Sequence, residues 1–61
     1  MIIKLTGKQE DYNTIGRTLK ALNMSIEPAY ITFDKYVELY ENEAQIMLVN
    51  WQAKTIEIKD K

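Results

Sequence analysis

Residues 45–51, with the sequence QIMLVNW, constrain the fold most, because they read as a β-strand with two apolar faces. Successive side chains of a strand point to opposite faces of its sheet, so Ile46 and Leu48 share one face. The opposite face carries Met47, Val49 and Trp51. A small domain has one core to fill, so we expect either a helix over each face or an interface with another protein on one of them.

Length and missing residue types limit how such a chain can be stabilised. With 61 residues, the chain is expected to form one domain, residues 1–61. A domain of this size buries only about 60% of its unfolded surface. The chain has no Cys and no His, which excludes disulfides and the usual ligands of a zinc site. Oligomerisation remains as an additional source of stability, and we expect a homodimer.

Charge and hydropathy place the protein in an ordinary globular class. Hydrophobic residues make up 46% of the chain, which is enough to drive folding. The formal net charge of -1 lacks the positive excess typical of nucleic-acid-binding proteins. No apolar run approaches the ~20 residues of a membrane span, and the N-terminal MIIKL is too short for a signal peptide's apolar region. We therefore expect a cytoplasmic protein without a membrane partner.

The N-terminal third predicts a strand followed by a helix. Residues 1–6 alternate as a strand does, and one face carries Met1, Ile3 and Leu5. Residues 8–22 predict a helix, whose apolar face consists of Tyr12, Ile15, Leu19 and Leu22. The sequence from Thr6 to Gln9 fits a capping box, and Asn23 suits the end of the helix, because Asn tolerates the left-handed conformation.

Residues 24–31, which contain Pro28, predict a loop or a short edge strand. Residues 33–42 are compatible with two structures, a helix or a strand. A helix with Thr32 as its N-cap would bury Phe33, Tyr36, Val37, Tyr40 and Ala44. A strand would turn Val37 and Leu39 to the core and Tyr36, Glu38 and Tyr40 to solvent. The helical spacing favours the helix, and the β-branched and aromatic composition favours the strand. We predict the helix, because spacing is the stronger signal.

The end of the chain predicts a β-hairpin. Its second strand turns Ile56 and Ile58 inward and Thr55, Glu57 and Lys59 outward. The loop near residues 50–54 lacks an Asn-Gly or Asp-Gly turn, so we expect it to be longer than two residues. The element order is then β-α-(α or β)-β-β. This order predicts an α+β domain with a small, mostly antiparallel sheet and one or two helices packed on it.

No residue pattern indicates catalysis, a cofactor or a metal site. Most nucleophilic and general-base schemes use His, and the acidic candidates Glu38, Glu41 and Glu43 lie in a solvated charge run. A chain this short leaves little room for the ~300 Å³ or more of a ligand cleft. TGK before the helix is an incomplete phosphate loop, so Gly7 is expected to ease a tight turn, with at most a weak anion site there. Gly16 is expected where the helix approaches the sheet closely.

Two surfaces are candidates for binding. The first is apolar and aromatic, a composition enriched in protein interfaces, and comprises Met47, Val49, Trp51, Tyr36, Glu38 and Tyr40. The second is basic and would bind nucleic acid through Lys8, Arg17, Lys20 and Lys54, with Tyr12 or Trp51 stacked on a base. Glu10, Asp11 and Glu57 would weaken the field of the basic surface. The protein-binding surface is therefore preferred.

The sequence as a whole predicts a small non-catalytic regulator or inhibitor that binds another protein. Phages and plasmids often carry accessory proteins of this kind. The alternative is a nucleic-acid-binding regulator that uses the basic helix face. Binding to nucleic acid would weaken steeply with salt, whereas an apolar protein interface would respond little.

Overall fold

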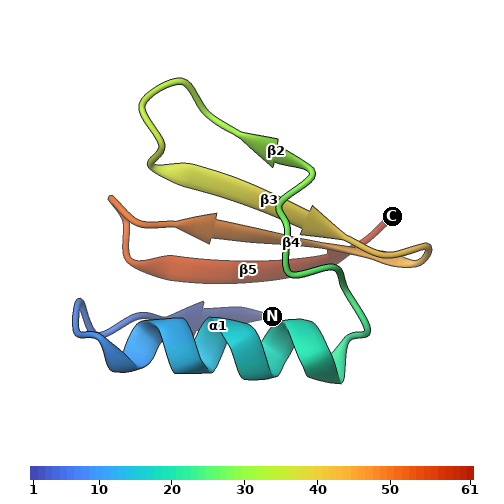
Figure 1. Cartoon of the computed structure of the whole chain (residues 1–61), viewed down its shortest axis with the longest axis horizontal. Coiled ribbons are helices and arrows are strands. Elements are labelled where there is room, and N and C mark those ends of the chain that lie inside the picture. The colour runs from blue at the N-terminus through green and yellow to red at the C-terminus, as the bar shows by residue number, and fades with distance from the viewer.

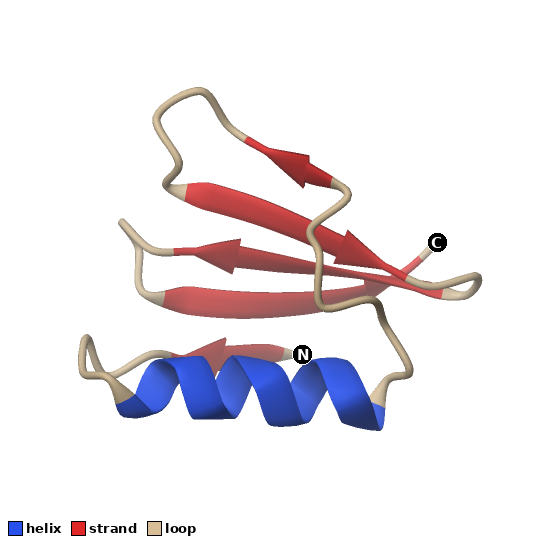
Figure 2. Ribbon diagram, in the orientation of Figure 1, coloured by secondary structure: helices blue, strands red, loops and turns tan.

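The computed structural model describes residues 1–61 and shows one helix on a five-stranded antiparallel sheet, which confirms the predicted α+β class (Figure 2). In chain order the elements are β1 (Ile2–Lys4), α1 (Glu10–Ala21), β2 (Tyr30–Ile31), β3 (Val37–Glu41), β4 (Gln45–Asn50) and β5 (Thr55–Asp60). Their order in the sheet is β1-β5-β4-β3-β2. Strands β2 to β5 therefore form a meander of consecutive neighbours, and β1 is added beside β5.

Helix α1 connects the two edges of the sheet, because β1 and β2 are the outer strands. Figure 1 shows α1 and the segment that follows it in front of the strands, on one side of the sheet. Met24, in that segment, is buried with the core. The opposite side carries no helix, so the molecule has two layers. We call the side under α1 the covered face and the other side the open face.

Strand register decides which side chains reach the covered face, because cross-strand partners point to the same side. One row of partners consists of Ile3, Ile56, Val49, Glu38 and Ile31, and a second row consists of Ile58, Met47 and Tyr40. Met47, Val49 and Ile56 are 0% exposed. The core also includes Tyr40 and Ile58 from the second row, together with Leu5, Ile15, Leu19 and Met24. The alternation predicted for β1, β4 and β5 is confirmed.

The start of α1 differs from the predicted capping box. Gln9 is the N-cap residue and makes no side-chain capping hydrogen bond. Thr6 instead bonds to a carboxylate inside the helix, since its backbone N–H and its Oγ1–H both donate to Asp11 Oδ1, over 2.9 and 2.8 Å. These bonds let Asp11 take the inward position predicted for Tyr12, whose side chain is 67% exposed.

The end of α1 agrees with the sequence. Asn23 has a φ of 55°, in the left-handed region. The Met24 N–H donates to the Leu19 carbonyl over 2.9 Å, and the Asn23 N–H donates to the Lys20 carbonyl over 3.2 Å. This pair of bonds is the Schellman motif, which satisfies carbonyl groups that the helix leaves unpaired.

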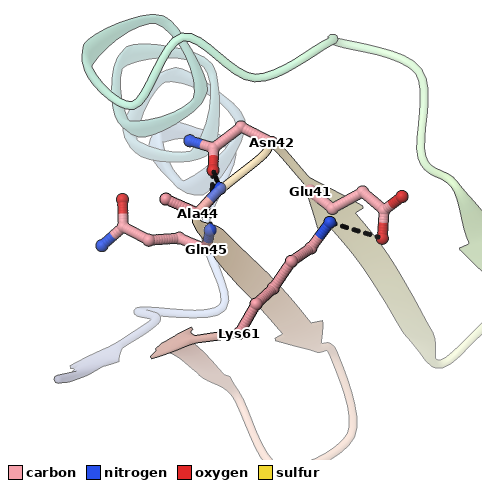
Figure 3. Close-up of polar contacts among 5 residues, drawn as sticks. All are labelled: Glu41, Asn42, Ala44, Gln45 and Lys61. Atoms are coloured by element: carbon pink, nitrogen blue, oxygen red, sulfur yellow. Dashed lines mark hydrogen bonds and ion pairs between the residues drawn. The ribbon is translucent and has the colours of Figure 1, made fainter.

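Asn42 organises the turn between β3 and β4 (Figure 3). Its Oδ1 accepts hydrogen bonds from the backbone N–H groups of Ala44 and Gln45, over 2.9 and 2.7 Å. Its Nδ2 donates to the Leu22 carbonyl over 2.6 Å. One side chain therefore shapes the turn and fastens it to the end of α1.

Residues 33–42 contain no helix, so the helix prediction is wrong, and Val37–Glu41 forms strand β3. The helical interpretation needed Phe33 to be buried, but Phe33 is fully exposed in the turn between β2 and β3. Lys35 in that turn has a φ of 62°, which a helix does not allow. Strand propensity prevailed over helical spacing because β3 pairs with a neighbour on each side.

The faces of β3 are also the reverse of the strand alternative. Glu38 and Tyr40 lie on the covered face, opposite Val49 and Met47. Val37 and Leu39 lie on the open face, not in the core. Because Met47 and Val49 fill the core, the pairing register obliges their partners on β3 to point to the same side.

Loop and glycine predictions had mixed outcomes. The loop between β4 and β5 spans residues 51–54 and is longer than two residues, as predicted. Gly7 has a φ of +79°, which confirms a tight turn that favours glycine. The close approach predicted at Gly16 is wrong, because nothing lies within 4 Å of a Cβ added there.

Candidate functional site

Most residues predicted to bind protein lie on the covered face and belong to the core or border it. Met47 and Val49 are 0% exposed and Tyr40 is 6% exposed. Trp51 packs against the core from the loop after β4. The structure therefore places Met47, Val49 and Tyr40 in the core and not on an exposed surface. Tyr36, directly before β3, stays about half-exposed.

Glu38 fastens the polar border of the covered face. Its Oε1 accepts a hydrogen bond from the indole N–H of Trp51. Its Oε2 accepts a hydrogen bond from the Tyr40 hydroxyl over 3.2 Å. Burial, followed by the charge and the hydrogen bond of Glu38, raises the pKa of Tyr40 to about 12. Glu38 therefore links Tyr40 and Trp51 by hydrogen bonds at the edge of the core.

The open face carries apolar side chains that no helix covers. Leu39 and Leu48 are cross-strand partners in its middle, and Tyr30 lies beyond Leu39 on β2. Tyr30 is 62% exposed, and the leucines are half-buried. We call the apolar side chains of β2, β3 and β4 on this side the open-face patch: Tyr30, Val37, Leu39, Ile46 and Leu48.

The half of the open face over β1 and β5 is charged, with Ile2 as its apolar exception. Glu57, which lies between Ile2 and Leu48 in one cross-strand row, pairs with Lys59 over 2.8 Å. A second ion pair at the end of β3 joins Glu41 and Lys61 over 3.8 Å (Figure 3). The charged residues on this side have both signs: Lys4, Lys59, Lys61, Glu41 and Glu57.

Two residues of the predicted basic surface, Lys8 and Lys54, meet at a pocket of about 460 Å³. The pocket lies where the turn before α1 meets the loop between β4 and β5. Tyr12 and Trp51 also line it, with ring centroids 5.3 Å apart and ring planes 40° apart. Ligand pockets measure about 300–1,000 Å³. The expectation that the chain leaves little room for such a pocket is therefore wrong.

The remaining charges of the predicted basic surface are distributed differently from the prediction. Arg17 and Lys20 lie farther along α1 and do not line the pocket. Asp11 and Glu57 were expected to weaken the basic field, but Asp11 points inward and Glu57 lies on the open face. Glu10 remains exposed at the start of α1.

Asp11 fixes the turn at the base of the pocket. Its side chain is 2% exposed, and its carboxylate accepts hydrogen bonds from the N–H and hydroxyl of Thr6 and from the N–H of Gly7. These bonds, above all the one from the Thr6 N–H, hold the pKa of Asp11 below its ordinary value of 3.8. The Lys8 N–H also bonds within the chain, to Thr6 Oγ1. The N–H groups of Gly7 and Lys8 are therefore already bonded within the chain.

No known protein family, curated protein or solved structure matches this chain. The class that the fold defines is a two-layer α+β domain with one helix on an antiparallel sheet. That helix is too short and too polar to cross a membrane. The open-face patch and the pocket beside Trp51 are the two features from which a function can be argued.

Sequence reasoning missed the open-face patch, although Ile46 and Leu48 already marked a second apolar face. The signal that identifies this face lies in β5, where Glu57 and Lys59 point away from the core. In the hairpin Leu48 pairs with Glu57 and Ile46 pairs with Lys59. The polar side of β5 therefore identifies the side of β4 that no helix covers.

Proposed function

We propose that this protein is a non-catalytic binding protein that docks on other proteins through the open-face patch, and that its first partner is a second copy of itself. The patch supports the proposal, because apolar surface of this kind with a polar surround is typical of interaction sites. A protein of this kind regulates or inhibits by occupying its partner's surface.

A second copy suits the open face in charge. The face carries lysines and glutamates together, so it does not require a partner of one opposite sign. In a two-fold dimer each surface meets its own copy. A lysine such as Lys59 on one protomer is then able to lie near a glutamate such as Glu41 on the other.

A second copy also suits the face in size. The molecule measures 29 × 24 × 19 Å, and the shortest dimension lies across the two layers (Figure 1). The open face is therefore bounded by 29 by 24 Å, an outline of the same order as the ~800 Å² that each partner buries in a standard interface. Only 10 of 61 residues are buried in the isolated chain. Burial of the patch between two copies would extend this small core.

The test is sedimentation equilibrium over a range of protein concentrations, on the wild type and on Leu48→Lys. We expect the wild type to be a dimer and Leu48→Lys to be a folded monomer, because the substitution places a charge in the middle of the patch. Asn13→Lys adds the same charge on an exposed position of α1 and should stay dimeric. Circular dichroism confirms that each variant is folded, and Leu39→Lys replaces Leu48→Lys if the latter unfolds.

A wild type that stays monomeric at every concentration would overturn the second copy as partner. A dimer that persists in both Leu48→Lys and Leu39→Lys would overturn the open-face patch as its interface.

A further inference from the structure

The pocket beside Trp51 has an aromatic wall that the fold holds in place. The backbone N–H of Trp51 donates to the Tyr36 carbonyl over 2.7 Å, and its indole N–H donates to the carboxylate of Glu38. These two bonds fix the orientation of the ring. Tyr12 stands beside it from the first turn of α1, with a centroid separation of 5.3 Å. The pocket therefore presents ring surface on which a flat group is able to stack.

The same pocket has two ammonium groups with no carboxylate partner. The ion pairs of the chain involve Lys59 and Lys61, and neither Lys8 nor Lys54 belongs to one. Lys54 Nζ lies 3.3 Å from the place where a Cβ on Gly7 would be, so the absence of a side chain at Gly7 leaves room for it. The backbone of Lys54 is anchored as well, since its carbonyl accepts a hydrogen bond from the Leu5 N–H over 2.8 Å.

The one acidic residue in the pocket lining has its carboxylate bonded within the chain. Asp11 lines the pocket, but its carboxylate is occupied by Thr6 and Gly7. Two lysines and one aspartate leave the lining with an excess of positive charge. The site therefore combines an aromatic surface with cations free to meet an anion.

A flat ring that carries a phosphate matches both features. Aromatic side chains bind unpaired bases by stacking, and basic residues beside them follow the phosphates. A base within a duplex has its faces covered by its neighbours. An inorganic phosphate would use the lysines but leave the aromatic wall without a contact.

We propose that this pocket binds an unpaired nucleotide, with its base stacked on Tyr12 and Trp51 and its phosphate held by Lys8 and Lys54. The nucleotide is either free or part of a single strand. The site does not depend on the open-face patch, because it lies on the helix side of the sheet. A dimer formed through the open faces would leave one pocket accessible on each protomer.

The experiment uses the fluorescence of Trp51, the only tryptophan of the chain. The wild type is titrated at low salt with adenosine 5′-monophosphate and, separately, with a short single-stranded oligothymidylate. We expect saturable quenching by at least one of them. Tighter binding of the oligothymidylate, with a steep salt dependence, identifies the single strand as the source. Comparable binding of the mononucleotide identifies the free nucleotide.

Two variants and one control locate the binding. Tyr12→Ala should weaken it about tenfold, within the range for loss of one stacked base. Lys54→Ala should weaken it about tenfold, as for loss of one hydrogen bond to a charged group. Lys20→Ala removes an equal charge from a part of α1 that does not line the pocket and should leave the affinity unchanged.

Three outcomes would overturn the proposal. The first is the absence of quenching by both probes. The second is an affinity that Tyr12→Ala and Lys54→Ala leave unchanged. The third is equal or tighter binding of inorganic phosphate or of phosphotyrosine, which would identify a simple anion site or a peptide site instead.

Discussion

The covered face and the open face are made by the same five strands, yet they differ in how completely the chain hides their side chains. Met47 and Val49 have no exposed surface, whereas Ile46 and Leu48, their neighbours in β4, stay half-buried. The faces differ because α1 and the segment after it pack on one side of the sheet only. Apolar character therefore does not by itself identify the core of a sheet this small.

Polar groups differ between the two faces in the same way. On the covered side the carboxylates of Asp11 and Glu38 accept hydrogen bonds, and no buried side-chain nitrogen or oxygen lacks a partner. On the open side the pairs of Lys59 with Glu57 and of Lys61 with Glu41 are partly exposed to solvent. Exposed pairs contribute little to stability. The buried polar groups of the covered face are therefore paired within the chain, whereas the charged groups of the open face stay partly exposed to solvent.

The largest expected effect compares two neighbours in β4. Met47→Ala should lower the free energy of unfolding by about 2–5 kcal/mol, because it leaves a cavity in the core. Leu48→Ala should lower it by about 1 kcal/mol at concentrations where the protein is monomeric, because Leu48 is already partly exposed. Urea unfolding followed by Trp51 fluorescence measures both.

A control is needed because a chain of 61 residues has a total stability of only about 3–9 kcal/mol. Met47→Leu keeps the volume of the side chain and should cost less than about 1.5 kcal/mol. Equal losses for Met47→Ala and Leu48→Ala would remove the distinction between the two faces.

The second effect concerns the carboxylate that fastens α1 to the turn before it. The pKa of Asp11 is lowered in the folded protein, so its contribution is fully present above the ordinary value of 3.8. That contribution is lost as the pH falls below 3.8 and through the lowered pKa. Asp11→Asn should therefore be less stable than the wild type at neutral pH, and the difference should shrink in acid. Urea unfolding at a series of pH values measures it, and a difference independent of pH would contradict it.

The sequence predicted those elements of the fold for which its local patterns agreed on one structure. The alternation of Ile56 and Ile58 with polar residues located β5 and its inner side. Asn23 located the end of α1 because few residues adopt a positive φ without strain. Such features are determined by residues that are close together in the sequence, so a single sequence is enough to predict them.

The features that could not be predicted depend on contacts between segments that are far apart in the sequence. The spacing from Phe33 to Ala44 resembles a helix, but β3 forms because β2 and β4 pair with it from both sides. The choice of face on β4 depends on its register with β5, which the loop at residues 51–54 sets. Lys8 and Lys54 are far apart in the chain, and only the fold reveals their shared pocket.

A smaller effect tests whether helix α1 can be stabilised without a change in the open face. Gly16→Ala should raise the free energy of unfolding by about 1 kcal/mol, because Gly is unfavourable inside a helix and nothing lies within 4 Å of the added Cβ. The tendency to dimerise, measured by sedimentation, should not change.

Gly7→Ala is the contrasting variant. It should destabilise the protein, because Gly7 has a φ of +79° and Lys54 Nζ lies 3.3 Å from the new Cβ. A gain from both substitutions would show that helix propensity and turn geometry do not account for these positions.

The smallest effect concerns the hydroxyl of Tyr40 on the covered face. A raised pKa means that the contribution of this group is present below the ordinary value of 10.0 and is lost as the pH rises towards about 12. Glu38→Gln removes the negative charge beside the hydroxyl and should lower the pKa of Tyr40, which NMR of its ring carbons measures. The pKa should still stay above 10.0, because burial is the larger cause. A return to 10.0 would mean that the Glu38 charge accounts for the whole shift and that this part of the covered face is open to water.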